Sequence, residues 1–477
     1  MGESSLTKWQ ALFEPICNIY RVPLISPGKE SEMHLQHGKY ILILTGVLLA
    51  GALMPAFGET REVILIESPE VTLVGEAGAG KLYQVGEHPV LVMEGTPEEM
   101  GYQHGKLLAP KIHHIIKEGY TPKALWNRGY SREYVMAQSA RMEKFFPEAV
   151  KEELRGLVRG LREAGYEQVT YEDVQLGITQ AEILHFPPDG PPACSNFACW
   201  GKWTTDGRLL HGRNLDWNIE GDAQDDHVIL VWRPKGGTPF MMVGWAGGIG
   251  SVSGMNSKGI TMGEMTLPSP DATFDGLPLL LQMRLTLETA ATLEEAVAFM
   301  EKCSRTTGWN FILGDGKIPS GRALETDAQY CTVFAPMDEK ETAKTGHWGM
   351  EDMVRRTNHP VGREQLLRLG IGMGEEFGLT ITEDTDIEML LPLLTGQDSW
   401  KRYECLSREI EKQPGKVDIA QALQLLATPP VYNKDTLHSM VFDPKNDTVY
   451  VANAGNNPPV TATDRPYTRI DLTPWFN

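Results

Sequence analysis

The stretch Cys194-Ser-Asn-Phe-Ala-Cys-Trp-Gly-Lys-Trp-Thr-Thr-Asp-Gly-Arg-Leu-Leu-His-Gly-Arg-Asn-Leu-Asp-Trp217 decides how the rest of the chain is interpreted. A β-prone run opens with a cysteine, Thr205-Asp-Gly207 signals a hairpin turn, and the return run ends in Arg213-Asn-Leu-Asp216. A cysteine at the head of a strand can act as a nucleophile whose own α-amino group is the general base, provided that the chain is cut just before it. The stretch therefore predicts a self-processing hydrolase or acyltransferase, cleaved between Ala193 and Cys194.

The chemistry of a freed Cys194 supports this hypothesis. A thiol is a weak nucleophile until it loses its proton, with a free pKa of about 8.5, whereas an α-amino group titrates at about 7.7–8.0, close to physiological pH. Self-cleavage would begin when the thiol attacks the Ala193 carbonyl, and water would open the resulting thioester. The segment Phe186-Pro-Pro-Asp-Gly-Pro-Pro-Ala193 is either an interdomain linker or a stiff arm that presents this bond, since prolines exclude helix and central strand. The alternative for Cys194 is a buried or disulfide-bonded cysteine.

Composition narrows the class of protein. The chain has 477 residues, and its formal net charge of −19 with a pI of about 5.1 argues against nucleic-acid binding, which needs a basic surface. The same charge disfavours electrostatic attachment to anionic lipid. We therefore expect a soluble protein that acts on a small neutral or amphiphilic substrate.

The N-terminal region resembles an export signal. Residues 40–56 form an apolar run, and Ala56-Phe57-Gly58 offers a small-x-small cleavage site. We expect residues 1–58 to be a leader, with Met33 as an alternative start, and the mature protein to be secreted or periplasmic. An uncleaved membrane anchor is the alternative, because the run is only slightly shorter than a spanning helix. Of six cysteines, Cys17 would be lost with the leader and Cys194 is expected to be free, which leaves the pairing of four others open: Cys199, Cys303, Cys331 and Cys405.

The hydrophobic periodicity of the sequence changes at Cys194, which divides the chain after the leader into two segments. Residues 59–193 are predicted to be helix-rich, with a helix over Thr96–Leu108 that starts in a capping box. Residues 194–477 are predicted to be mostly antiparallel strands in hairpin order, covered by helices such as a long one over Leu279–Met300. Gly75–Lys81 lacks the Ser/Thr of a phosphate loop and is predicted to be a plain glycine-rich loop.

The Cys194–Trp217 hairpin resembles that of the cysteine N-terminal nucleophile (Ntn) hydrolases, and within them the peptidase C45 group, whose namesake is acyl-coenzyme A:isopenicillin N acyltransferase. Weaker matching segments are Gly95–Gly105, Gly254–Ile260, Thr357-Asn-His359 and Asp443-Pro444. The resemblance implies an α+β fold, an αββα four-layer sandwich of two antiparallel sheets between helical layers. It also implies cleavage into a smaller and a larger chain that stay associated, and acyl transfer from an amide or thioester without a cofactor.

The resemblance also assigns roles to residues beyond Cys194. Asp216 would orient the Cys194 amine, Arg213 would supply a fixed charge, and Arg402 resembles a late family arginine near the thiol. Because side chains alternate along a strand, Arg213 and Asp216 would both face the thiol only if a bulge or strand end occurs near Asn214.

A tetrahedral intermediate needs preorganised donors for its oxyanion. Asn358 is the first choice for this role and Asn310 its rival. The relatives place a polar group such as Asn in the strand where this chain has Glu264 and Thr266, which leaves a second donor unassigned. Of six tryptophans in the β-rich part, most are expected in the core and some could line an apolar acyl pocket: Trp200, Trp203, Trp217, Trp232, Trp245 and Trp309.

Three other functions stay open at this point. A phospholipase B-like esterase on the same fold would release fatty acid from lipid esters, and a silent binding protein would remain one intact chain. A metal hydrolase would use His211, Asp216 and His227. The sequence does not name the acyl or leaving group, and it does not separate hydrolysis from transfer.

Overall fold

The computed structural model describes residues 62–185, 193–217, 222–342, 349–377, 382 and 398–477. The predicted leader and the proline-rich segment 186–192 lie outside the described residues. Within the described part, no helix is long and apolar enough to cross a membrane.

A seven-stranded sheet, here called sheet A, carries Cys194. Its strand order is β1-β17-β16-β15-β6-β5-β14. The strands are β1 (Leu65–Ile66), β5 (Ala193–Cys199), β6 (Leu210–Asp216), β14 (Met353–Arg356), β15 (Thr436–Asp443), β16 (Thr448–Asn453) and β17 (Tyr467–Asp471). The predicted hairpin is confirmed as the antiparallel β5–β6 pair, with Cys194 opposite Leu215. Because β5 lies between β6 and β14, the strand that begins at Ala193 is hydrogen-bonded on both sides.

A ten-stranded sheet, sheet B, has the order β13-β12-β11-β10-β9-β8-β7-β4-β3-β2. Its strands are β2 (Val71–Ala77), β3 (Gly80–Val85), β4 (His88–Gly95), β7 (His227–Pro234), β8 (Phe240–Trp245), β9 (Ser253–Asn256), β10 (Ile260–Thr266), β11 (Trp309–Asp315), β12 (Ser320–Thr326) and β13 (Cys331–Phe334). Neighbours pair antiparallel except β4 and β7, which run parallel. Gly75 lies inside β2, so the prediction of a loop over Gly75–Lys81 was wrong apart from the turn at Gly78.

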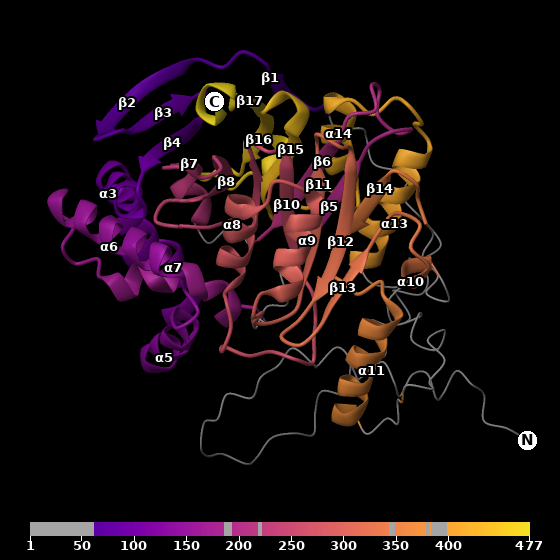
Figure 1. The fold of residues 1–477 in the computed structure, drawn as a ribbon, viewed down its shortest axis with the longest axis horizontal. Helices are drawn as coiled ribbons and strands as arrows, with labels where there is room; N and C mark the ends of the chain where they lie inside the picture. Colours follow the sequence, from indigo (N-terminus) through magenta and orange to yellow (C-terminus); the bar gives the residue numbers. More distant parts are fainter. Residues whose placement is uncertain (1–61, 186–192, 218–221, 343–348, 378–381, 383–397) are drawn as a thin grey trace, which may run out of the picture. The chain divides into compact units, whose positions relative to one another are not determined.

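The two sheets stack face to face, and helices cover both outer faces (Figure 1). Strands β10 and β11 pack on β5, while α8 (Leu279–Thr289) and α9 (Leu293–Lys302) cover sheet B. Helices α13 (Asp398–Glu411) and α14 (Ile419–Leu426) cover sheet A. The αββα architecture is therefore confirmed. The long helix predicted over Leu279–Met300 is two helices, because Thr292 caps a new start at α9.

The segment upstream of Cys194 adds a helical group beside the sandwich. It comprises α3 (Pro97–Leu107), α4 (Ala109–His113), the short π-helical turns His114–Glu118 and Pro122–Trp126, α5 (Arg132–Glu143), α6 (Glu148–Glu163) and α7 (Tyr171–Ile183). The capping box at the start of α3, between Thr96 and Glu99, is confirmed. Helices α3 and α6 cross at close range, since a Cβ on Gly101 would lie 1.9 Å from the Glu153 carbonyl oxygen.

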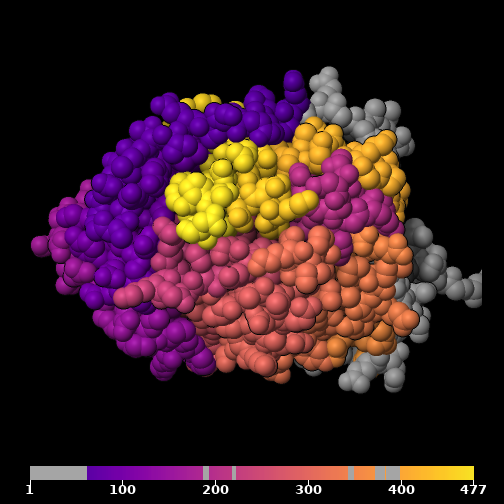
Figure 2. All heavy atoms as spheres, turned by 45° about the horizontal axis from the view of Figure 1, so that its top comes forward, coloured from indigo at the N-terminus to yellow at the C-terminus, as the bar shows by residue number. Residues whose placement is uncertain are grey.

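Upstream and downstream segments form one compact unit. Strand β1 pairs with β17, and strands β2, β3 and β4 extend sheet B through the β4–β7 ladder. In the space-filling view the N-terminal strands lie along the C-terminal residues, as the pairing of β1 with β17 requires (Figure 2). The predicted boundary between residues 193 and 194 therefore does not separate two independently packed bodies. The remaining helices are α11 (Arg363–Phe377) and the short α10 (Glu339–Thr342) and α15 (Thr473–Phe476).

Candidate active site around Cys194

Cys194 is the second residue of β5 and is 1 % exposed. Its side chain lies between the two sheets and reaches the wall of an apolar pocket. The contacts described below are those of the uncut chain, in which the nitrogen of Cys194 is a peptide N–H.

Asn358 holds that nitrogen. The Cys194 N–H donates to Asn358 Oδ1 over 2.7 Å. The Asn358 side chain is fixed at its other end, where Nδ2 donates to the Thr266 carbonyl at 3.0 Å, and its backbone N–H donates to Ser399 Oγ at 2.7 Å. The amide group therefore presents its oxygen, not its NH₂, to Cys194. The predicted role of Asn358 as an oxyanion donor stays a prediction.

Arg402 approaches Cys194 from α13. Its Nη1 donates to the Cys194 carbonyl oxygen and, at 3.1 Å, to Ser195 Oγ, and its Nη2 donates to Asn358 Oδ1 at 3.0 Å. The side chain is 2 % exposed, and its Nε pairs with Asp398 one helical turn earlier. The structure thus brings Arg402 and Asn358 together on the backbone of Cys194, from elements more than forty positions apart in the sequence.

Arg213 lies beside the thiol. Its Nη2 is 3.7 Å from Cys194 Sγ and 3.0 Å from Glu264 Oε2, and its Nε donates to the Glu264 carbonyl at 3.0 Å. A further bond runs from Nη1 to Ser253 Oγ. Arg213 is paired with Asn196, two residues after Cys194, so strand alternation places the two side chains on the same face of sheet A.

Asp216 has different surroundings. The β5–β6 ladder is regular through Asn214, so the bulge that would turn both charged side chains to one face is absent from this pair. On the other side of β6, the register of the β15–β6 pair shifts between Thr436 and His438 of β15. The Asp216 carboxylate accepts from Thr436 Oγ1 at 2.6 Å, and the backbone N–H of Asp216 favours the Cys194 thiolate. Orientation of the Cys194 amine by Asp216 stays a prediction.

The electrostatics of this site keep the thiol protonated in the uncut chain. Burial raises the pKa of Cys194 to about 12, although the charge of Arg213 opposes the shift. Burial also raises the pKa of Glu264 to about 7 and of Asp216 to about 6. Cys194 therefore needs a nearby proton acceptor before it can attack, and two carboxyl groups titrate in the range where such an acceptor works best.

Glu264 is the site residue that sequence reasoning missed. It lies in β10, is 3 % exposed and faces Cys194 across the gap between the sheets. The sequence marked this position only as a departure from the relatives. An available signal was the acidic residue in an otherwise apolar strand, because a buried carboxylate needs a cation and Arg213 is the partner in the facing strand.

Asn310, the other candidate oxyanion donor, is bonded to the turn that carries Asn358. Its Nδ2 donates to the carbonyl groups of Thr357 and His359 at 2.9 and 3.2 Å. Ser399 contacts the same turn, accepting from the Asn358 N–H and donating to Thr357 Oγ1. These bonds fix the turn that carries Asn358.

An apolar pocket ends at Cys194. Its lining is dominated by apolar groups from both sides of the predicted cut. Upstream residues that line it include Ile115, Ile116, Tyr120, Ala181 and Leu184, and downstream ones include Leu215, Val252, Leu279, Leu280 and Glu264. Of the six tryptophans expected in this region, Trp217, Trp245 and Trp309 line the pocket, whereas Trp232 is fully buried elsewhere in the core. Such a lining suits an alkyl or aromatic acyl group.

The other predicted groups behave as follows. All five cysteines in the described part of the chain are free thiols. His211 is bonded to Asn196 and Thr261, whereas His227 is bonded to His88 and His438, so the structure does not gather the ligands of the alternative metal site. Across the described ranges, no group of three or more His, Cys, Asp or Glu side chains could hold a metal ion.

Comparison with known proteins adds a family match. The sequence profile of the acyl-coenzyme A:6-aminopenicillanic acid acyl-transferase family matches residues 203–458, more than half of the chain. An uncharacterized protein of Archaeoglobus fulgidus is 26 % identical over 467 residues, which covers 92 % of this chain and 70 % of that protein. The Dictyostelium discoideum protein dcd1A is 22 % identical over 445 residues, covering 85 % and 90 % of the two chains.

Two solved structures align at low similarity. An N-acylethanolamine-hydrolyzing acid amidase ortholog of Caenorhabditis elegans has a TM-score of 0.38 and 17 % identity, covering 53 % of this chain and 93 % of its own. A mutant of the conjugated bile acid hydrolase of Clostridium perfringens has a TM-score of 0.36 and 13 % identity, covering 59 % and 93 %.

Proposed function

The chain belongs to the acyl-coenzyme A:6-aminopenicillanic acid acyl-transferase family of Ntn-type hydrolases and acyltransferases, and from this premise we propose that it is an autoproteolytic cysteine enzyme. Its substrates would be small N-acyl compounds whose linear amide, or thioester, bond is opened through an acyl-thioester on Cys194. The product would be a free acid if water enters, or a new amide if an amine enters.

The observation that carries the proposal is the double engagement of Cys194. The nitrogen that cleavage would convert into an amine already has a hydrogen-bond acceptor in Asn358, and the sulfur of the same residue lies beside Arg213 and at the end of a pocket. After cleavage, the nucleophile, the general base and the substrate space would meet at one residue, as an N-terminal nucleophile requires.

Self-cleavage would proceed in two steps. The Cys194 sulfur bonds to the Ala193 carbonyl carbon, the C–N bond breaks, and the thiol proton passes to the departing nitrogen, which becomes the α-amine. Water then hydrolyses the thioester, which leaves a carboxylate on Ala193 and a thiol on Cys194. Arg402 lies on the Cys194 carbonyl and keeps this end of β5 in place while the bond before it is exchanged.

Turnover would repeat the chemistry on a substrate. The amine takes the thiol proton, the sulfur attacks the acyl carbon, and the leaving group departs with that proton. The apolar pocket supports an alkyl or aromatic acyl group, because burying its surface contributes about 25 cal/mol per Å² to binding. Export through residues 1–58 belongs to the same proposal and predicts a mature chain that starts near Glu59.

The test is intact mass measurement and N-terminal sequencing of purified wild-type protein beside Cys194→Ala. We expect two fragments in the wild type, the larger one starting at Cys194, and one unbroken chain in Cys194→Ala. Cys199→Ala is the matched control, since Cys199 is a buried cysteine of the same strand that does not line the pocket, and it should be cut like the wild type. An active wild-type enzyme with an uncut chain would overturn the proposal.

A substrate panel then separates the bond types. Fatty-acyl amides, esters and thioesters with one acyl chain should be compared under identical conditions. Release of acid from the amide supports the proposal, whereas activity confined to lipid esters would point to the esterase alternative.

A further inference from the structure

Two side chains that contact Cys194 reach it from different elements. Asn358 follows β14 by two residues, and Arg402 lies within α13. They meet at one atom, because Asn358 Oδ1 accepts from both Cys194 N and Arg402 Nη2. The distance between β14 and α13 therefore sets the geometry around the nitrogen of Cys194.

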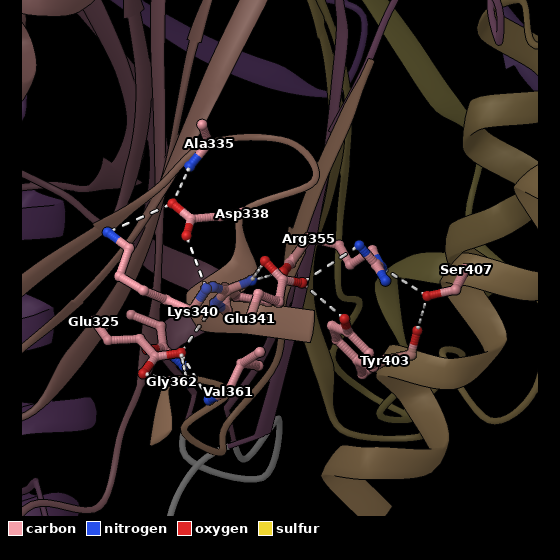
Figure 3. A network of polar contacts seen from close by, with 12 residues as sticks. Glu325, Ala335, Asp338, Lys340, Glu341, Arg355, Val361, Gly362, Tyr403 and Ser407 are labelled. Atoms are coloured by element: carbon pink, nitrogen blue, oxygen red, sulfur yellow. Dashed lines mark hydrogen bonds and ion pairs between the residues drawn. The ribbon is translucent and has the colours of Figure 1, made fainter. Parts of the chain in front are cut away.

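A single carboxylate joins these two elements. Glu341, in the short helix α10, accepts from Tyr403 of α13 with Oε1 at 2.8 Å. The same carboxylate pairs with Arg355 at 3.5 Å and with Arg356 at 3.2 Å, the last two residues of β14. Figure 3 shows dashed lines from the Glu341 carboxylate to both Arg355 and Tyr403. Tyr403 is the neighbour of Arg402, and Arg356 is two residues before Asn358.

Arg355 reinforces the same junction. Its Nε donates to Ser407 of α13 at 2.6 Å, and its guanidinium lies over the Tyr403 ring with 4.4 Å to the centroid (Figure 3). Glu325, from β12, closes the other side, where it pairs with Arg356 at 3.2 Å and accepts from the Val361 N–H at 2.7 Å. The turn that carries Asn358 is thus fixed at both ends.

Charge balance makes Glu341 difficult to replace. Arg355 and Arg356 are 1 % and 0 % exposed, and the carboxylates that face them in the described chain are Glu325 and Glu341. Removing one charge from a buried ion-pair cluster is more damaging than removing a surface pair. Replacement of Glu341 would therefore allow β14 and α13 to separate.

We propose that Glu341 is a positioning residue that fixes Asn358 and Arg402 against the backbone of Cys194. The inference rests on the proposed function, because its consequence is the rate of self-cleavage and of turnover. Glu341 touches neither the thiol nor the pocket, so substrate affinity should be preserved while the chemical step slows.

The primary test compares Glu341→Gln with Glu339→Gln, an exposed residue of the same helix. Glu341→Gln should slow self-cleavage by about 10- to 100-fold, as a displacement of about 1 Å at reacting groups does. With an N-acyl aminocoumarin as probe, kcat should fall by a similar factor while KM changes less than about 3-fold. Glu339→Gln should match the wild type in both measurements.

A second pair separates positioning from loss of stability. Glu153→Gln breaks another buried carboxylate–arginine pair, with Arg284 at 2.5 Å, and shares no partner with Glu341. At equal fractions of folded protein, measured by urea unfolding, Glu153→Gln should retain wild-type kcat and Glu341→Gln should not. Equal kcat losses in the two variants would overturn the inference.

If Glu341→Gln does not fold, Tyr403→Phe provides a second test of the same junction. It removes one hydroxyl from the junction and should lower kcat by about 3- to 10-fold. Combined with Glu341→Gln where that variant folds, it should add little, because both changes break one bridge. Wild-type kcat in Tyr403→Phe would contradict the inference. An uncut wild-type chain would instead contradict the proposed function, so the two failures are distinguishable.

Discussion

The two sides of the Ala193–Cys194 bond contribute different things to one site. The upstream segment supplies a wall of apolar side chains such as Ile116 and Leu184, whereas the charged groups around the thiol come from downstream, among them Arg213 and Glu264. The charged groups around the thiol therefore lie downstream of the predicted cut, whereas the two segments share the wall of the pocket. A change to the upstream wall should alter which substrate fits, and a change to a charged group beside the thiol should alter how fast any substrate reacts.

The largest effect is expected at Asn358, on the chemical side. Asn358→Ala removes the acceptor of the Cys194 N–H and should slow self-cleavage by about 100-fold. Asn358→Asp keeps an acceptor oxygen but loses the NH₂ group that an oxyanion donor would need. Self-cleavage measured by intact mass over time should survive better in Asn358→Asp than in Asn358→Ala. The reverse order would favour the predicted oxyanion role.

A smaller effect is expected at Ile116, on the recognition side. Ile116→Trp fills the pocket and should lower kcat/KM for a long-chain acyl amide by about 10- to 100-fold, in line with the cost of overpacking. The rate of self-cleavage should be unchanged, because the groups bonded to Cys194 are Asn358, Arg402 and Arg213 and do not include Ile116. Ile318→Trp, at an exposed position, is the control. Loss of self-cleavage in Ile116→Trp would break the division between the two segments.

A more modest change is expected at Glu264. Its negative charge raises the pKa of Cys194, so Glu264→Gln should lower that pKa and increase the rate of alkylation by iodoacetamide at a fixed pH. Each unit of pKa corresponds to about a 10-fold change in thiolate fraction. Glu182→Gln is the matched control, a buried carboxyl near the pocket that does not pair with Arg213. Identical alkylation rates in Glu264→Gln and the wild type would show that Glu264 does not influence the pKa of the Cys194 thiol.

The smallest effect is a pH dependence of stability. Burial lowers the pKa of six histidines below the usual 6.5: His88, His104, His185, His211, His227 and His438. The contribution of the neutral histidines to the free energy of unfolding is present above about pH 6.5. It is lost as the pH falls toward the pKa values of the folded state, which are about 4 for His88 and about 3 for His104. Buried carboxyls oppose this trend, because burial raises the pKa of Asp216 to about 6, of Glu264 to about 7 and of Glu182 to about 8, and it also raises the pKa values of Glu153 and Glu325.

These histidines also connect the two segments. His88 of β4 is 2.9 Å from His227 of β7, which is 3.2 Å from His438 of β15. The charges of three nearby cations, Arg465, Lys111 and Arg213, also lower the pKa values of these three histidines. The Glu87 carboxylate is 3.8 Å from the His88 ring. We expect the free energy of unfolding, measured with urea, to fall between about pH 7 and about pH 5. A constant or rising value would show that the carboxyls dominate.

The sequence predicts the strand-forming part of this molecule well and its long-range contacts poorly. The β5–β6 hairpin and the helix at Thr96 follow from local turn and cap chemistry. Arg402 and Asn358 were found only by resemblance. Their meeting at Cys194 depends on the packing of α13 against sheet A, which no local pattern encodes.

The errors have physical causes as well. The β5–β6 ladder is regular from Ala193 opposite Asp216 to Cys199 opposite Leu210, so no bulge near Asn214 turns Arg213 and Asp216 to one face. Glu264 was not assigned a role, because its partner Arg213 lies 51 positions away in the facing sheet. Strand β14 was not predicted, since four residues with two arginines do not resemble a buried strand.

The parallel β4–β7 ladder has a practical consequence for anyone who expresses this protein. Six consecutive pairs, from Val90 with Ile229 to Gly95 with Pro234, tie the first part of the polypeptide into a sheet built mainly by the second. A gene divided at codon 194 should therefore yield two complementing products that reassemble when co-expressed, and neither half should be soluble alone.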